Sequence, residues 1–165
     1  MSNTITAAPV RHKNTGVEMF LPKMAKINKV EVMNERETWY EIEYLDKASL
    51  GHTPGQFVEV SIFGVGEAPI SISSDPLVEG KFELCVRNAG VVTNKISQLK
   101  AGDTVGIRGP FGTGFDVNNF KGKNVLFVAG GLGYVPLRSL INYVRKTRKE
   151  YKDVTLLYGT REPKE

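Results

Sequence analysis

The sequence offers few of the side chains that bind metals or redox clusters. Its 165 residues include a single cysteine, Cys85, and two histidines, His12 and His52, whose separation matches no spacing of metal ligands. One thiol can form no disulfide within the chain, and it cannot supply the cysteine set that holds an iron–sulfur cluster. The sequence therefore predicts that this chain carries no metal centre.

Long apolar segments are also missing. No run approaches the roughly 20 apolar residues that cross a bilayer, and the N-terminal residues lack the apolar core of a secretory signal. The sequence therefore predicts a cytoplasmic protein without a membrane span.

Clusters of positive charge are short and contain no interleaved aromatic residues. The formal net charge of +4 comes partly from residues 145–149 and from residues 11–13. Nucleic-acid surfaces combine basic with aromatic side chains, whereas a charge run on a predicted helix is typical of a solvated face. We therefore expect no nucleic-acid partner. The overall composition, 41% hydrophobic and 24% charged, is that of a soluble folded protein.

The first 118 residues are dominated by short segments of alternating apolar and polar residues. Residues 1–20 have no such pattern and are interpreted as a flexible tail. Residues 64–69 are expected to break one strand before another resumes. Six closely spaced strands and one small helix predict a compact antiparallel barrel over residues 21–118. The expected strands are 25–32, 39–44, 57–62, 70–74, 81–87 and 104–112, and the helix is 94–99, opened by residues 90–93.

The pattern changes in residues 119–165, where an α/β unit is expected. Val125–Gly130 is a continuously apolar strand, a helix should run from about residue 135 to 150, and Val154–Gly159 reads as a second, parallel strand. One βαβ unit has too little surface for an independent doubly wound sheet. We therefore expect either that these residues are the first part of a longer protein or that another chain covers the exposed strand edge.

The turn between that strand and that helix, residues 130–133, contains three glycines. Glycine permits positive φ and lets phosphate groups approach the amides at a helix start, where the helix dipole favours negative charge. The turn is thus a candidate phosphate cradle. A tight strand-to-helix turn needs glycine for steric reasons as well, and both interpretations stay open at this stage.

Three separated motifs occur in an order that resembles the ferredoxin–NADP reductase superfamily: residues 68–74, residues 84–94 and residues 130–136. Residues 54–58 and 109–112 extend the likeness from about Met24 onwards. Within that superfamily, residues 66–74 and 131–140 look most like the flavin subunits of anaerobic electron-transfer complexes, namely the gamma subunit of sulfhydrogenase and the flavin subunit of anaerobic sulfite reductase. The resemblance implies a Greek-key, antiparallel, flavin-binding β-barrel followed by a partial α/β nucleotide-binding domain.

The resemblance also implies individual roles around FAD. Ser71 would be the catalytic residue, with its hydroxyl at N5 of the flavin, and Ile70 would pack against the ring. The alternative for Ser71 is an ordinary strand serine, and Thr93 could equally cap the small helix. The residues expected to bind FAD are Ala68, Pro69, Ile70, Ser71, Cys85, Val86, Arg87, Gly90, Val91, Val92 and Thr93.

One position departs from the superfamily pattern. Many relatives have an arginine where this chain has Ala68, and that arginine pairs with the flavin diphosphate. We hypothesise that Arg87 supplies part of the missing charge, because a guanidinium suits a phosphate. Glu67 is expected to face solvent or the ring edge, since like charges repel.

The resemblance assigns the binding of a nicotinamide nucleotide to the glycine-rich turn and to the residues after the last strand. Arg161 could contact a ribose or phosphate, or it could be a charged residue at a frayed end. Nothing in the sequence separates NAD from NADP. The residues expected to bind NAD(P)H are Gly130, Gly131, Gly133, Pro136, Thr160 and Arg161.

The function implied is that of an FAD-dependent oxidoreductase or electron-transfer subunit. It would exchange hydride between NAD(P)H and FAD and pass electrons to a redox partner subunit of the hydrogenase, sulfite reductase or ferredoxin type. In this subgroup a [2Fe–2S] centre is bound by a C-terminal cysteine cluster, which this chain does not contain. Two alternatives remain: the electron-transfer subunit of dihydroorotate dehydrogenase, and a flavin-binding fragment that catalyses nothing.

Overall fold

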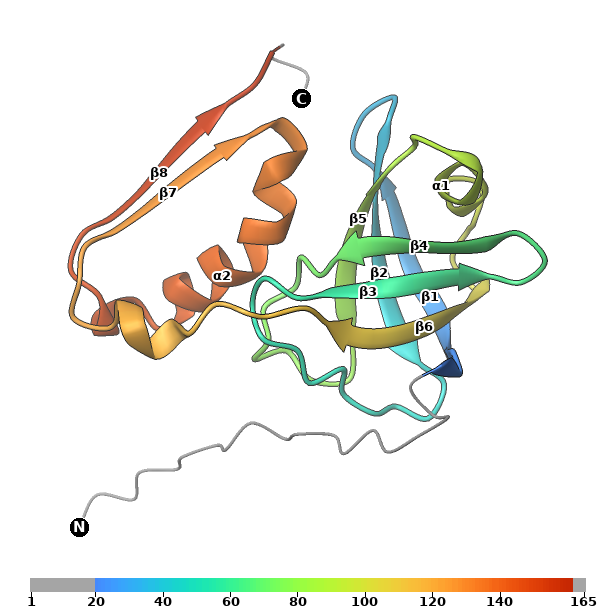
Figure 1. Cartoon of the computed structure of the whole chain (residues 1–165), viewed down its shortest axis with the longest axis horizontal. Coiled ribbons are helices and arrows are strands. Elements are labelled where there is room, and N and C mark those ends of the chain that lie inside the picture. Colours follow the sequence, from blue (N-terminus) through green and yellow to red (C-terminus); the bar gives the residue numbers. More distant parts are fainter. Residues whose placement is uncertain (1–19, 162–165) are drawn as a thin grey trace.

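A computed structural model describes residues 20–161, which form two parts (Figure 1). The larger part is a six-stranded sheet in the order β4-β3-β6-β1-β2-β5, and every neighbouring pair is antiparallel. A single bridge joins Ile72, just after β4, to Leu84 within β5, so the sheet curls into a barrel that is not closed along its length. The strands are β1 (Lys23–Val32), β2 (Glu37–Tyr44), β3 (Phe57–Ile62), β4 (Gly66–Ser71), β5 (Phe82–Arg87) and β6 (Thr104–Phe111).

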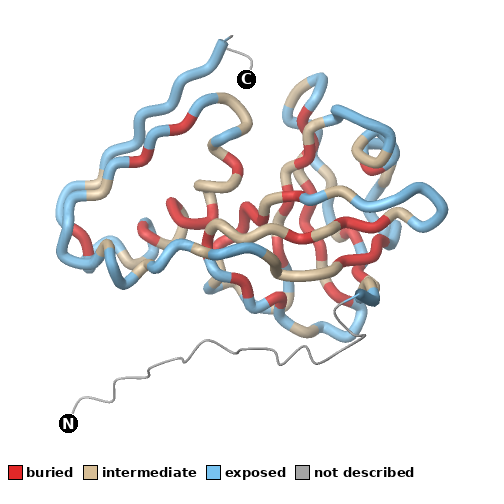
Figure 2. Tube along the Cα trace, viewed as in Figure 1, coloured by how far each residue is buried: buried red, intermediate tan, exposed pale blue. Residues whose placement is uncertain are grey.

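The barrel interior is filled by one face of each strand. In β5, Phe82, Leu84 and Val86 are buried while the residues between them are half-buried, which is the two-residue alternation of a sheet with one face on the core. Figure 2 shows the buried positions gathered inside the barrel. The antiparallel barrel expected from the sequence is thus confirmed.

Several element boundaries differ from expectation, and β4 differs at both ends, since it stops at Ser71 rather than at residue 74. The strand expected at 70–74 is β4, which begins at Gly66 and pairs with β3 from Ile62 onwards, so only three residues close that hairpin. Pro69 is tolerated within β4 because an edge strand does not need every amide. The small helix α1 (Val91–Ile96) begins three residues earlier than expected. Gly90 is its N-cap residue, and the hydroxyl of Thr93, in the first turn, accepts a hydrogen bond from the Gly90 amide.

The smaller part is the predicted βαβ unit. Strands β7 (Val125–Gly130) and β8 (Val154–Gly159) pair in parallel, and α2 (Tyr134–Lys146) covers one face of that pair. The helix ends four residues before the expected boundary and is followed by a short 3-10 turn, η4 (Arg148–Glu150). Two further 3-10 turns, η2 (Val117–Phe120) and η3 (Gly131–Gly133), precede β7 and α2.

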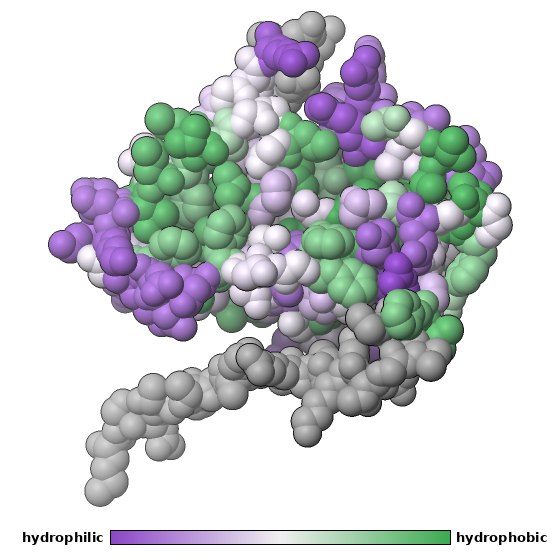
Figure 3. Space-filling view, viewed as in Figure 1, coloured by the Kyte–Doolittle hydropathy of each residue, from purple (hydrophilic) through white to green (hydrophobic). Residues whose placement is uncertain are grey.

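The other face of β7 and β8 is apolar and uncovered. Leu126 and Val128 are 60% and 65% exposed, and Leu157, which pairs with Val128, is exposed beside them. Figure 3 shows apolar surface over β7 and β8 at the left of the view. No helix within residues 20–161 has the length and apolar character to span a membrane.

The two parts are joined by contacts between α2 and the segment that follows β4. Arg138 donates to the carbonyl oxygen of Ser73 at 3.1 Å and forms an ion pair with Glu83 of β5. Further along the helix, Lys146 pairs with the buried carboxylate of Asp75 at 2.9 Å. Because this segment directly follows Ser71, the same few residues fix the end of β4 and the position of α2.

Candidate functional site

A cavity of about 400 Å³ opens where β4 ends, opposite the glycine-rich turn before α2. We call it the serine cavity. Elements from both parts of the molecule contribute to it: β4 and β5 from the barrel, α1 from its rim, and the turn with the start of α2 from the βαβ unit. Its lining residues are Pro69, Ile70, Ser71, Cys85, Arg87, Thr93, Leu132, Gly133, Val135 and Pro136.

Ser71 is the last residue of β4 and is half-buried at the wall of the serine cavity. Within residues 20–161 its hydroxyl makes no hydrogen bond, so its donor and its acceptor capacity are both unused. Ile70 also reaches the wall, although it is 8% exposed and mainly packs in the barrel core. The cavity therefore combines an apolar wall with an unpaired hydroxyl.

The Thr93 side chain is engaged at the start of α1. Its Oγ1 accepts hydrogen bonds from the amides of Ala89 and Gly90, each at 2.9 Å, and donates to the carbonyl oxygen of Gly90 at 3.1 Å. Thr93 thus takes part in capping α1, but from the third helical position, because the N-cap residue is Gly90. The residue still lines the serine cavity, so a cofactor role stays a prediction.

Arg87 does not stand free on the outer face of β5. Its Nε pairs with Glu37 of β2, whose carboxylate is buried. A charge already neutralised by a neighbour attracts a phosphate less strongly, although the terminal guanidinium nitrogens keep donor capacity. The hypothesis that Arg87 replaces the missing arginine therefore concerns only its terminal guanidinium nitrogens, and it stays a prediction.

Glu67 is exposed to solvent, which is one of the two positions expected from the sequence, and its carboxylate is in addition paired on the barrel surface. It accepts two hydrogen bonds from the guanidinium of Arg108, one of them at 2.9 Å from Nε, and a third from the hydroxyl of Ser61. These donors lower the pKa of its carboxyl to about 2, led by Arg108. The reason is sheet order: β3 lies between β4 and β6, so residue 67 reaches across it to Arg108.

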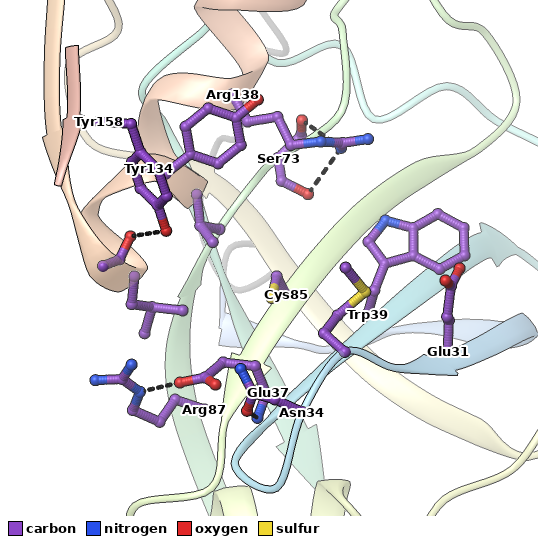
Figure 4. Close-up of a pocket in the computed structure, with 14 residues that line it drawn as sticks. Glu31, Asn34, Glu37, Trp39, Ser73, Cys85, Arg87, Tyr134, Arg138 and Tyr158 are labelled. Carbon is purple, nitrogen blue, oxygen red and sulfur yellow. Dashed lines mark hydrogen bonds and ion pairs between the residues drawn. The ribbon is translucent and has the colours of Figure 1, made fainter. Parts of the chain in front are cut away.

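A second cavity, of about 320 Å³, lies beside the first, between the outer face of the barrel and the carboxyl ends of β7 and β8 (Figure 4). We call it the aromatic cavity. The hydroxyl of Tyr158 donates to the carbonyl oxygen of Gly131 at 3.3 Å, which ties β8 to the turn. The cavity is lined by Glu31, Met33, Asn34, Glu37, Trp39, Ser73, Cys85, Arg87, Gly131, Leu132, Tyr134, Val135, Arg138 and Tyr158.

The glycine-rich turn contributes to both cavities. Gly131 adopts φ +47°, in the left-handed region that favours glycine, so the steric interpretation of this residue holds. The short 3-10 turn then leads directly into α2. Gly131 lines the aromatic cavity, and Gly133 and Pro136 line the serine cavity.

Several residues expected to bind cofactors line neither cavity. Val86 points into the barrel and is 4% exposed, Ala68 packs against the same core, and Gly130 ends β7. Gly90, Val91 and Val92 lie at the start of α1, beyond the cavity rim. The exposed Thr160 and Arg161 follow β8.

Cys85 lies on the outer face of β5 and lines both cavities. Burial raises the pKa of its thiol, so the neutral form predominates at neutral pH. Among residues 20–161 no group of three or more acidic, histidine or cysteine side chains is arranged to hold a metal.

Sequence reasoning missed Trp39, Tyr134, Tyr158 and Arg138. Trp39 occupies the outward phase of β2, while Tyr40 and Ile42 face the core. That alternation marks Trp39 as a large apolar residue on the outside of a barrel, which was a usable signal. No local signal brings Tyr158 to the same cavity, because that contact depends on how the two parts dock.

Comparisons with known proteins agree with this geometry. Residues 25–115 match the family described as "Oxidoreductase FAD-binding domain". Sulfhydrogenase 1 subunit gamma of Pyrococcus furiosus is 43% identical over 139 residues, which is 82% of this chain and 48% of that protein. A probable dihydroorotate dehydrogenase B electron transfer subunit of the same organism is 38% identical over 134 residues, 78% of this chain and 48% of that protein. The chain spans about half the length of these relatives.

Solved structures show the same fold. The NADH-dependent reduced ferredoxin-NADP oxidoreductase is 27% identical with a TM-score of 0.71, covering 84% of this chain and 49% of that one. A ferredoxin NADP+ reductase from Neisseria gonorrhoeae, solved with bound FAD and NADP, is 20% identical with a TM-score of 0.70, covering 86% of this chain and 58% of that one. At that identity the second likeness concerns the fold alone.

Proposed function

Since the chain belongs to the family of FAD-binding oxidoreductase domains, we propose that it binds FAD with the flavin ring in the serine cavity and serves hydride exchange with NAD(P)H. The observation that supports this most directly is the hydroxyl of Ser71, which lines an open cavity and has no partner within residues 20–161. An unpaired polar group beside an apolar wall suits a planar ring that carries hydrogen-bonding nitrogens.

The residues that line the serine cavity fit the flavin ring of FAD. Pro69, Ile70 and Val135 provide the apolar wall, and Ser71 can donate to or accept from a flavin nitrogen as its hydroxyl rotates. Bound FAD would supply hydride acceptance and one-electron transfer, chemistry that no side chain of this sequence provides. The role of the protein would be to hold the flavin ring, to keep the hydroxyl of Ser71 at the edge of that ring and to exclude water.

A nicotinamide nucleotide would bind on the glycine-rich turn. Open α/β sheets bind nucleotides just outside the carboxyl ends of their parallel strands. Gly130, Gly131 and Gly133 lie at that end of β7. Thr160 and Arg161 follow the neighbouring strand end and remain candidates for its outer edge. The choice between NAD and NADP stays open.

We further propose that electrons pass to a separate redox partner subunit of hydrogenase, sulfite reductase or ferredoxin type. The support is that the relatives compared above are, by name, a sulfhydrogenase subunit and an electron transfer subunit. A cytoplasmic location stays a prediction from the sequence, as do the domain limits 21–118 and 119–165.

The first test is an anaerobic visible spectrum of the 165-residue chain mixed with FAD and then with NADH or NADPH. Flavin bands that appear and then bleach would support both binding and reduction. Bound flavin that stays oxidised would favour the non-catalytic alternative for this chain. If no flavin band remains with the protein after gel filtration, the proposal is wrong.

Ser71→Ala separates the two roles proposed for the cavity. We expect FAD affinity to change little and flavin reduction to slow by about tenfold, the value of one lost hydrogen bond at the reacting ring. Ser49→Ala, at an exposed serine whose oxygen accepts from the amide of Gly80, is the matched control. Equal rates in both variants would remove Ser71 from the site.

The second candidate function is that of a dihydroorotate dehydrogenase electron-transfer subunit. The 38% identity to such a subunit favours keeping it. It predicts the same flavin chemistry, and only the partner subunit differs. Reduction of a dihydroorotate dehydrogenase catalytic subunit by the FAD-loaded chain would distinguish it.

A further inference from the structure

The chain crosses from one side of the barrel opening to the other immediately after Ser71. The amide of Ile72 still donates to the carbonyl oxygen of the residue before β3, at 3.1 Å. The amide and the hydroxyl of Ser73 donate instead to the carbonyl oxygen of Glu83 in β5, at 2.9 Å and 3.1 Å. We call residues 71–73 the crossing segment. Because this segment is short and extended, whatever holds Ser73 also determines where Ser71 lies.

Arg138 reaches the crossing segment from α2. Its Nη1 donates to the carbonyl oxygen of Ser73 at 3.1 Å (Figure 4), and the same nitrogen forms the ion pair with Glu83. Ser73 is 0% exposed, so its carbonyl oxygen depends on a donor from the protein rather than on bulk water. A partly exposed ion pair contributes little by itself, whereas the contact to a buried carbonyl fixes a position of the backbone.

The helix that carries Arg138 also forms the opposite wall of the serine cavity. Val135 and Pro136 line that wall from the first turn of α2, directly after Gly133 of the glycine-rich turn. Arg138 follows Val135 by about one helical turn, and the hydrogen-bonded helix keeps this spacing constant. A single side chain therefore links the wall that carries Ser71 to the wall that carries the glycine-rich turn.

We propose that Arg138 is a positioning residue that sets the width of the serine cavity. It keeps the hydroxyl of Ser71 at a fixed separation from the glycine-rich turn, through the carbonyl oxygen of Ser73 on one side and its place in α2 on the other. The consequence rests on the proposed function. Hydride exchange requires the reacting groups to be held about 3–3.5 Å apart, and a displacement of about 1 Å costs about a hundredfold in rate.

The first experiment uses the full chain without FAD, so it does not depend on the flavin assignment. Arg138→Met keeps the apolar stem of the side chain and removes its donors. We expect the amides of Ile72 and Ser73 to exchange about tenfold faster in this variant, measured by NMR, while the amides of β3 and β6 keep their rates. Arg145→Met, at an exposed arginine of the same helix, is the matched control. Unchanged exchange at both amides would overturn the inference.

Two further variants separate the contact to Ser73 from the ion pair. Arg138→Lys can bring one nitrogen to the Ser73 carbonyl, as Nη1 does, and should restore most of the lost protection against exchange. Glu83→Gln removes the ion pair but leaves the guanidinium able to donate to Ser73, so exchange should stay close to that of the unchanged chain. No recovery in Arg138→Lys, or a full loss of protection in Glu83→Gln, would contradict the proposal.

The second experiment uses the FAD-loaded chain. We expect Arg138→Met to slow flavin reduction at saturating NAD(P)H by about a hundredfold with little change in KM, because the nucleotide binds but is held at the wrong separation. Ser71→Ala should then cost less in the Arg138→Met chain than the roughly tenfold expected when it is made alone, because the hydroxyl is already displaced. Costs that simply multiply in the double variant would show that the two residues act independently, which contradicts the positioning role.

Failure of this inference can be told apart from failure of the proposed function. Amide exchange is measured without FAD, and FAD binding is read from the visible spectrum. A chain that binds FAD, but whose Ile72 and Ser73 amides do not respond to Arg138→Met, contradicts the inference alone. A chain that never retains FAD contradicts the flavin assignment, and the exchange rates then decide by themselves whether Arg138 fixes the crossing segment.

Discussion

The barrel and the βαβ unit differ in how much of their apolar surface they cover by themselves. The barrel encloses a core of sixteen buried hydrophobic residues between strands that pair almost all the way round. The βαβ unit has a buried cluster of five hydrophobic residues on one side of a two-stranded sheet and exposed leucine and valine on the other. Parallel sheets are usually covered on both faces. The comparison indicates that the barrel can fold by itself, whereas the βαβ unit depends on its contacts with the barrel.

The substitution with the largest expected effect on stability tests the barrel core. Leu84→Ala removes a side chain that is 1% exposed, and we expect a loss of about 2–5 kcal/mol in the free energy of unfolding, from lost burial and the cavity left behind. Chemical denaturation followed by circular dichroism measures it. The control is Leu77→Ala, in an exposed loop; if both variants lose the same stability, the barrel is not the stable part of the molecule.

The next variant tests whether the βαβ unit opens separately. Val144→Ala empties a fully buried position beneath β7, and we expect a local cost of about 2 kcal/mol. Amide exchange should accelerate in β7, α2 and β8 and stay unchanged in β3 and β6. Equal acceleration in both parts would show a single cooperative unit and break the comparison.

A smaller effect is expected at the junction. Arg138→Ala removes the contacts to Ser73 and Glu83, and the loss should be about 1–2 kcal/mol because the ion pair is partly exposed. Thermal unfolding measures it, with Arg145→Ala, an exposed arginine on the same helix, as the control. A null result for Arg138→Ala would mean that the other contacts of α2 suffice.

His52 gives the junction a pH dependence. It is buried, its Nε2 is 3.0 Å from the carbonyl oxygen of Ser74, and desolvation lowers the pKa of its imidazole below the ordinary 6.5. The unfolded chain therefore binds more protons, so stability is complete above pH 6.5 and declines as pH falls toward the folded-state pKa. Unfolding curves of His52→Gln should show a flatter dependence over that interval; an identical slope would contradict it.

The smallest expected effect concerns the uncovered sheet face. Val128 is 65% exposed, so Val128→Thr should change the free energy of unfolding by no more than about 0.5 kcal/mol. Phe127→Ala, at the neighbouring buried position, provides the contrast and should cost several times more. A large loss in Val128→Thr would reveal that this face is covered in solution.

Much of the fold could be predicted because its signals are local. The period-two alternation of Phe82–Arg87 and the apolar run Val125–Gly130 each indicate their own strand. The start of β4 was misplaced because Gly64, Gly66 and Pro69 together read as a break. In the structure only residues 63–65 turn, and the edge position of β4 tolerates the proline.

The site could be predicted only where its chemistry is carried by short motifs. Ser71 and the glycine-rich turn were found in this way, and the structure brings them to one cavity. The pairing of Arg87 with Glu37 and the meeting of Trp39 with Tyr158 depend on strand order and on docking between the two parts. No local pattern encodes such contacts.

Cys85 has a practical consequence for studying this molecule. It is the only cysteine in the sequence, and it lines both cavities with a half-buried, largely neutral thiol. A maleimide-type reagent would therefore attach one probe per molecule, slowly, at the point where the two cavities meet. Protection of that thiol by a bound molecule would provide a chemical footprint of occupancy, readable by mass spectrometry even for ligands without colour or fluorescence.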